Sequence, residues 1–279
     1  MSSCDRQVAR ATVRDVSPAG RDGFRLSVVL PTPFTAPLEG GHFFMLRTDG
    51  ADFPFLNRPF SVHSARPDGR GPELSFLFKA VGRGTRCLAR LRPGDAVTLV
   101  GPLGQPFPAA EPGVTTVLVA GGVGLPPLFR WLERRRELGS REPALLLSGA
   151  RYRDQLFELE AAERLGVPVR TATEDGSHGL KGRVDALLAA TLTELAPRPV
   201  VVYTCGPDPM MAAVARLSAE RGARCLVSLE TLMACGFGVC NACAVPVTDG
   251  DGKLARYARA CMDGPVMEGS KVLWQAAAH

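Results

Sequence analysis

Residues 234–243 read ACGFGVCNAC and place Cys235, Cys240 and Cys243 in a C-x4-C-x2-C pattern. A fourth cysteine, Cys261, follows after seventeen further residues. Four thiolates at this spacing are typical of a [2Fe–2S] cluster, whose irons are held by cysteine sulfurs. The segment therefore predicts an iron–sulfur site with these four cysteines as its metal ligands.

The glycines of the same segment fit this chemistry. Gly236 and Gly238 can take positive φ and let backbone N–H groups approach the cluster sulfurs. A structural zinc site is the main alternative, because four cysteines also bind zinc tetrahedrally. A disulfide is a second alternative. Zinc sites more often use two C-x2-C knuckles, whereas this run contains one.

The bulk properties of the chain are those of a globular protein. Its 279 residues suffice for about two domains and a short cysteine module. The 33 basic and 28 acidic residues leave a net charge of +5, a modest excess that suits anionic cofactors or an acidic partner. No nucleic-acid-binding motif is present.

The distribution of apolar residues and cysteines indicates the compartment. The N-terminus has no apolar segment of the secretory kind, and no stretch is long enough for a transmembrane helix. Cysteines outside the cluster pattern are scattered, which favours a reducing cytoplasm over a disulfide framework. They are Cys4, Cys87, Cys205 and Cys225.

The first 110 residues read as short strands between Gly, Pro and Asp turns, without crossover helices. Five or six such strands, the first at Phe24–Leu30, predict a small antiparallel barrel. Within it, Arg58-Pro59-Phe60-Ser61 offers a cation for a phosphate, a flat apolar face and a hydroxyl. An ordinary strand start is the alternative for this tetrapeptide.

A second motif of the barrel is Gly82-Arg83-Gly84-Thr85, which opens a short helix. Such a turn leaves backbone N–H groups free to bind an anion, although an ordinary glycine turn has the same sequence. Because two phosphate-suited motifs occur in one barrel, each strengthens the interpretation of the other.

Residues 111–226 switch to alternating strands and helices. The apolar strand Thr115–Ala120 runs into Gly121-Gly122-Val123-Gly124 and then a helix from Leu125, which makes a cradle for a pyrophosphate. The spacing is not GxGxxG. A later strand, Val200–Thr204, ends at Cys205-Gly206-Pro207. The pattern predicts a doubly wound, parallel α/β sheet with ligands at the strand C-termini, and a helix at 154–165.

These motifs together resemble the ferredoxin–NADP reductase superfamily. The resemblance implies a flavin domain at 1–110, a nicotinamide-nucleotide domain at 111–226 and a [2Fe–2S] module at 227–279. It also implies that Cys205, otherwise more simply a buried structural cysteine, orders the contact between nicotinamide and flavin as a catalytic residue. The implied cofactor-binding residues are Arg58, Pro59, Phe60 and Ser61 with Gly82, Gly84 and Thr85 for FAD, and Gly121, Gly122, Gly124, Gly206 and Pro207 for NAD(H).

The C-terminal third narrows the resemblance to the electron-transfer subunit family of type B dihydroorotate dehydrogenase (the PyrK family). Met233–Cys240, reading MACGFGVC, and Cys261–Val266, reading CMDGPV, are the most specific parts. Two departures are a longer segment between Cys243 and Cys261, and Met267 in place of the usual Phe. The resemblance implies an FMN-containing catalytic partner that oxidises dihydroorotate, electron flow through the cluster and FAD to NAD⁺, and a heterotetramer of two plus two subunits.

Two other functions stay open at this point. An NAD(P)H-dependent reductase subunit could serve a ferredoxin, a hydrogenase or an oxygenase. A flavin-free regulatory module that keeps a cluster or zinc would leave the other motifs as coincidences. NADH is favoured over NADPH by the family resemblance, although Arg151 and Arg153 could bind a 2′-phosphate.

Overall fold

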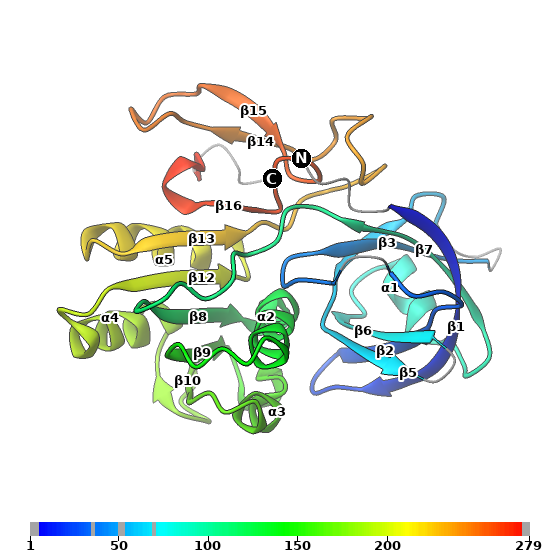
Figure 1. Ribbon diagram of the computed structural model, residues 1–279, viewed down its shortest axis with the longest axis horizontal. Helices are drawn as coiled ribbons and strands as arrows, with labels where there is room; N and C mark the ends of the chain where they lie inside the picture. Colours follow the sequence, from blue (N-terminus) through cyan, green and yellow to red (C-terminus); the bar gives the residue numbers. More distant parts are fainter. Residues whose placement is uncertain (1–5, 35–36, 50–53, 69–70, 275–279) are drawn as a thin grey trace.

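The structure is a computed structural model that describes residues 6–34, 37–49, 54–68 and 71–274 (Figure 1). It consists of two seven-stranded sheets and a two-stranded hairpin. Figure 1 shows the two large sheets side by side, with the cysteine-rich segment lying across one end of both. Cys4 lies outside the described residues. No described helix is long and apolar enough to cross a membrane.

The first sheet is antiparallel and curls around its own apolar core, which includes Leu26, Phe44 and Phe76. Its strand order is β4-β3-β7-β1-β2-β6-β5. The expected antiparallel barrel is confirmed. The elements are β1 (Gln7–Pro18), β2 (Gly23–Val29), β3 (Phe43–Thr48), β4 (Arg58–Ser61), β5 (Ser64–Asp68), β6 (Gly71–Lys79), α1 (Arg83–Leu88) and β7 (Ala96–Leu103).

The strand count of this sheet corrects the expectation of five or six strands. The strands absent from the prediction are β1, the first of the seven, and β5, of which only the first residue, Ser64, fell within a predicted strand. The buried positions of β1 are Ala9, Ala11 and Val13, with the exposed Arg10 and Thr12 between them and the exposed Val8 before them. Small residues bury little apolar area, so the alternation that marks a strand is weak in this stretch.

The second sheet is doubly wound, as expected. Its order is β11-β10-β9-β8-β12-β13-β16, and every pair is parallel except β13 with the edge strand β16. The elements are β8 (Thr115–Gly121), η1 (Gly122–Gly124), α2 (Leu125–Glu137), β9 (Ala144–Ala150), η2 (Arg153–Gln155), α3 (Leu159–Arg164), β10 (Val169–Thr173), β11 (Leu180–Lys181), α4 (Val184–Leu195), β12 (Val200–Cys205), α5 (Asp208–Glu220) and β13 (Arg224–Ser228).

The central strand β8 divides the apolar core of this sheet into two layers. Val117 and Val119 pack with the side chains of α4 and α5. Leu118 and Ala120 pack with those of α2 on the other face. Because successive side chains of a strand point to opposite faces, this continuous apolar run fills both layers.

The helix expected over residues 154–165 is interrupted. The structure has the short turn η2, followed by α3 from Leu159. Glu158 separates them with φ 53° and ψ 28°, in the left-handed region that a non-glycine residue rarely takes.

The cysteine segment continues from β13 and returns to the same sheet. The four cysteines flank the hairpin of β14 (Ala244–Val247) and β15 (Arg256–Arg259). After Cys261 the chain forms β16 (Val266–Glu268), which pairs with β13, and then η3 (Gly269–Lys271). The predicted boundaries at 110/111 and 226/227 stay predictions.

Candidate redox site

The four cysteines of the metal prediction stand as two pairs. Cys243 Sγ and Cys261 Sγ are 3.2 Å apart, and the side chains of Cys235 and Cys240 are hydrogen-bonded. Among the described residues, no group of three or more His, Cys, Asp and Glu side chains is arranged around a single metal ion. Two pairs suit a cluster with two thiolates on each iron better than a zinc ion that gathers all four.

The surroundings of the two pairs affect thiol ionisation in opposite directions. Burial opposes ionisation of Cys235, but the backbone N–H groups of Cys240, Phe237 and Val239 outweigh it and lower the pKa to about 6. Burial, followed by the hydrogen bond and charge of Cys243, raises the pKa of Cys261 to about 12. The loop thus supplies hydrogen-bond donors to sulfur on its exposed side, as a cluster requires.

The cysteine loop packs directly on the barrel. Gly236 has φ +84°, and a Cβ at this position would lie 2.5 Å from Met45 Cγ of β3. In the sheet, Met45 is in register with Pro59 of β4, the strand that carries the predicted flavin motif. The predicted cluster site is therefore one strand away from the predicted flavin site.

The four residues of the flavin motif are all half-buried along β4. The Phe60 ring lies 5.5 Å from that of Phe78, centroid to centroid. The Arg58 guanidinium donates to backbone carbonyls of Leu56 and Asn57. A half-open face that combines an aromatic ring, a cation and a hydroxyl fits an isoalloxazine with its phosphates.

The predicted pyrophosphate turn is tied together by hydrogen bonds at the start of α1. The Gly82 N–H donates to Thr85 Oγ1 at 2.9 Å, and the Thr85 hydroxyl is 3.1 Å from the Gly82 carbonyl. A Cβ built on Gly82 meets no atom within 4 Å, so its backbone borders open space. Gly84 is buried.

The predicted nicotinamide loop and the Cys205-Gly206-Pro207 turn are packed against each other. A Cβ on Gly124 would overlap the Cys205 carbonyl, and one on Gly121 would lie 2.9 Å from Pro207 Cδ. Gly122 has φ +52°, which favours glycine. The sequence places these two glycine-containing segments after different strands, and the structure brings them together at the C-terminal edge of β8 and β12.

The Cys205 side chain is 2% exposed. Burial, reinforced by the charge of Glu230, raises the pKa of its thiol well above the usual value, and a hydrogen bond with Ser228 opposes this only in part. A neutral thiol is a poor nucleophile. Its predicted role is therefore one of contact and orientation, and that role stays a prediction.

Sequence reasoning missed Glu230, which follows β13 and precedes the cysteine loop. Protein atoms crowd this carboxyl although its side chain keeps solvent contact, and desolvation with the charge of Asp208 raises its pKa to about 7. No motif marks Glu230 in the sequence. Its proximity to Asp208 and Cys205 arises only when β12 and β13 pair.

Replacing Glu230 with glutamine is expected to make the chain more resistant to unfolding at high pH. A raised pKa in the folded state means that ionisation costs stability as the pH rises from the ordinary value of 4.5 through about 7. After discounting for solvent contact, the gain at pH 8 relative to pH 5 is roughly 1 kcal/mol. Urea unfolding at both pH values measures it, with Glu163→Gln as the surface control. An equal gain in stability at both pH values would contradict the raised pKa of Glu230.

Comparison with known proteins identifies the family. Residues 230–273 match the model described as the iron–sulfur cluster binding domain of dihydroorotate dehydrogenase B. Residues 118–216 match the oxidoreductase NAD-binding domain. The electron transfer subunit of dihydroorotate dehydrogenase B (NAD⁺) from Shouchella clausii (strain KSM-K16) is 33% identical over 271 residues, covering 96% of this chain and 99% of that protein. This chain belongs to that family.

Further relatives support the same family, and solved structures support the same fold. The dihydroorotate dehydrogenase B electron transfer subunit of Desulforamulus reducens is 34% identical over 244 residues, covering 84% of this chain and 87% of its own length. A solved NADH-dependent reduced ferredoxin–NADP oxidoreductase superposes with a TM-score of 0.78 at 25% identity, covering 96% and 91% of the two chains. The ferredoxin reductase of carbazole 1,9a-dioxygenase shares the fold, with a TM-score of 0.67 at 21% identity over 80% and 68%.

Membership in the dihydroorotate dehydrogenase B electron transfer subunit family confirms the expected family and fold. The protein is an oxidoreductase subunit, and the two family models confirm the expected [2Fe–2S] cluster and NAD(H). Cys235, Cys240, Cys243 and Cys261 all lie within the matched iron–sulfur domain. The individual ligand and contact residues are not tested by these matches and stay predictions.

Proposed function

We propose that this chain carries electrons from a dihydroorotate-oxidising, FMN-containing catalytic subunit to NAD⁺. The observation that supports this most directly is the packing of the cysteine loop on β3, which pairs with the flavin strand β4. The identities of the substrate and the acceptor are inferred from the relatives, which are named as dihydroorotate dehydrogenase B (NAD⁺) electron transfer subunits. The residues proposed for each group are those of the sequence prediction.

The order of the groups follows from their electron counts. Nicotinamide exchanges two electrons as a hydride, an iron–sulfur cluster exchanges one, and FAD does both, so FAD belongs between them. The chain itself contributes the positions. Met45 of β3 and Leu103 of β7 pack directly against Gly236, which excludes water from this contact. The close packing of Gly124 on Cys205 shapes the nicotinamide loop.

The surface around the cysteine loop suits a protein partner. Leu232 is 82% exposed, Val239 73% and Phe237 44%. Apolar side chains gathered on one loop mark a site for protein contact. We assign this surface, called here the cluster face, to the catalytic subunit, because electrons must enter where the cluster is nearest to solvent. A heterotetramer of two plus two subunits in the cytoplasm completes the proposal.

The decisive test is anaerobic mixing of this chain, loaded with FAD and its cluster, with the catalytic subunit from the same genome. Dihydroorotate is expected to bleach the flavin and cluster absorbance only when the partner is present, and NAD⁺ is expected to restore it. Bleaching by NADH together with inertness to dihydroorotate would instead support a reductase that serves another acceptor, such as a ferredoxin.

Replacing Leu232 with aspartate is expected to weaken binding of the catalytic subunit about tenfold or more, because a buried apolar contact becomes a desolvated charge. Analytical ultracentrifugation or calorimetry measures the affinity. Leu138→Asp is the matched control, since Leu138 is 53% exposed and lies at the end of α2, away from the cluster face. An equal loss of affinity in both variants would show that the cluster face is not part of the interface.

A further inference from the structure

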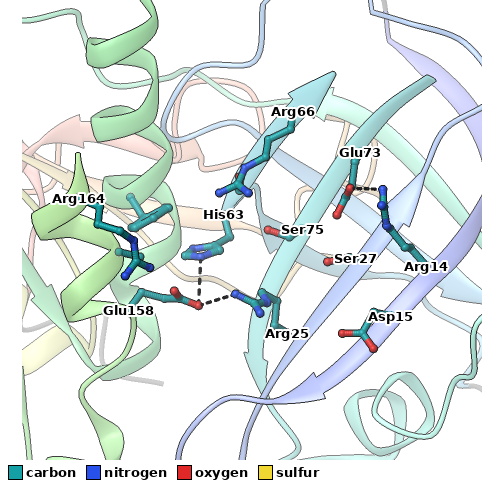
Figure 2. A pocket seen from close by; sticks show the side chains of 13 residues that line it. Arg14, Asp15, Arg25, Ser27, His63, Arg66, Glu73, Ser75, Glu158 and Arg164 are labelled. Atoms are coloured by element: carbon teal, nitrogen blue, oxygen red, sulfur yellow. Dashed lines mark hydrogen bonds and ion pairs between the residues drawn. The ribbon is translucent and has the colours of Figure 1, made fainter. Parts of the chain in front are cut away.

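A separate cavity of about 370 Å³ lies between the two large sheets, and no residue of the predicted cofactor sites lines it. One wall is the outer face of β1, β2, β5 and β6, and the other comes from α2 and α3 with the turn before it (Figure 2). The size is that of a site for a small metabolite. Its polar lining residues are Arg14, Asp15, Arg25, Ser27, His63, Ser64, Arg66, Glu73, Ser75, Glu158 and Arg164.

The floor of the cavity is a row of serines that crosses three strands. Ser64 of β5 is in register with Ser75 of β6, and Ser75 is in register with Ser27 of β2. Each of these serines is 7–8% exposed. Buried hydroxyls cost free energy unless they find partners, and the Ser64 hydroxyl finds one across this boundary by donating to Glu133 Oε1 of α2 at 2.6 Å.

A β-bulge extends this polar row onto β1. Asp15 is in register with Ser27 and Val13 with Val28, so Arg14 is an extra residue between them. Arg14 and Asp15 are therefore both exposed and both line the cavity, although strict alternation would turn one of them inward.

Guanidinium groups approach the cavity from both domains. Figure 2 shows those of Arg25, Arg66 and Arg164 arranged around His63 and Glu158. Arg25 Nη1 lies 3.0 Å from Glu158 Oε1, and His63 Nε2 lies 3.8 Å from the same oxygen. Each of the four lining arginines lies within 4 Å of a carboxylate, in the pairs Arg14–Glu73, Arg25–Glu158, Arg66–Glu133 and Arg164–Glu160. The pairs of Arg66 and Arg164 are the longest, at 3.5 and 3.9 Å, so these two guanidinium groups keep most of their N–H donors for a ligand.

His63 and Glu158 each have an energetically unfavourable feature where they border the cavity. His63 is 2% exposed, and its Nδ1 has no hydrogen-bond partner among the described residues. Burial and the charges of Arg25 and Arg66 lower its pKa to about 3, so its imidazole is neutral. Glu158 takes its left-handed backbone at the point where it meets Arg25. Strained residues and unpaired buried polar atoms cluster at ligand sites.

We propose that this cavity binds a small phosphate monoester, with Arg25 and Arg66 from the barrel and Arg164 from α3 as its anion-binding groups. Guanidinium groups bind phosphate oxygens through paired hydrogen bonds. The serine row and the neutral His63 can bind the polar remainder of the molecule. Because its contacts come from both domains, the bound ligand joins them at a place distant from the cysteine segment.

The test uses the chain loaded with FAD and its cluster, in saturating NAD⁺ so that the nucleotide site is filled. Calorimetric titration with glycerol 3-phosphate is expected to show one saturable site, and titration with glycerol none. The double substitution Arg66→Gln/Arg164→Gln is expected to weaken binding at least tenfold, and Ser75→Ala to weaken it less. Inorganic phosphate in competition shows whether the phosphate group alone is recognised.

Arg216→Gln is the matched control. Its side chain is 68% exposed, against 69% for Arg66 and 70% for Arg164, and it lies on α5 away from the cavity. Unchanged affinity in Arg216→Gln supports the site. The proposal is overturned by the absence of saturable binding up to about 10 mM, which corresponds to a negligible affinity. It is equally overturned by full affinity in the double variant or by an equal loss in the control.

Discussion

Cys261→Ser is expected to abolish the visible absorbance and electron paramagnetic resonance signal of the cluster, and to lower dihydroorotate-dependent NAD⁺ reduction about a thousandfold or more. A serine oxygen is a poor replacement for a thiolate on iron, and Cys261 is buried beside Cys243 with its sulfur 3.2 Å away. Removal of one ligand of this pair leaves an iron with incomplete coordination. The holoenzyme with its catalytic partner is the material to assay.

Two readouts distinguish loss of the cluster from loss of the fold. NADH-driven reduction of ferricyanide through the flavin is expected to persist in Cys261→Ser, because the predicted FAD and nicotinamide residues all lie outside the cysteine segment. Cys225→Ser is the control, since Cys225 is a buried cysteine on β13 outside the cluster pattern. If Cys261→Ser keeps a full [2Fe–2S] signal, the ligand assignment is wrong.

Gly124→Val is expected to slow NADH-driven flavin reduction by about a hundredfold or more, because misplacement of reacting groups by an ångström has effects of this size. Any side chain on Gly124 overlaps the Cys205 carbonyl and approaches the Gly206 nitrogen to 2.6 Å. The nicotinamide loop and the turn after β12 cannot then keep their present contact. Stopped-flow absorbance at the flavin band gives the rate.

The matched control for Gly124→Val is Val123→Ala, which changes the same turn but removes atoms instead of adding them. FAD content and the cluster signal are expected to be normal in both variants, since neither site includes this turn. If Gly124→Val stays within about threefold of the wild-type rate, the loop does not position the nicotinamide, and its predicted role in nucleotide binding is wrong.

The sequence was most informative where chemistry restricts residue types. The cysteine spacing, the β4 tetrapeptide and the glycine turn after β8 each need particular residues at particular positions, so they were found without the fold. The apolar run Thr115–Ala120 likewise indicated a strand buried on both faces, and the structure places it at the centre of a doubly wound sheet.

Features that depend on contacts between distant segments were not predicted. β1 was missed because its inward side chains are small, and residues 154–165 looked continuous because Glu158 is an ordinary helix former. The Glu158 carboxylate accepts a hydrogen bond from Arg25, 133 residues away in the sequence, which no local pattern reveals. The raised pKa of Glu230 and the serine row have the same origin, since each exists only after strands have paired.

The return of the chain from Cys261 into β16 has a consequence for how such proteins can be altered. The cysteine segment resembles a separate module in the sequence, yet its last strand, β16, is hydrogen-bonded to β13 of the nucleotide-binding sheet. Deleting this segment would expose the edge of the nucleotide-binding sheet at β13. Transferring it to another protein would leave β16 without a pairing partner. A recombination event that moved this redox centre between proteins would therefore have to carry at least β13 with it.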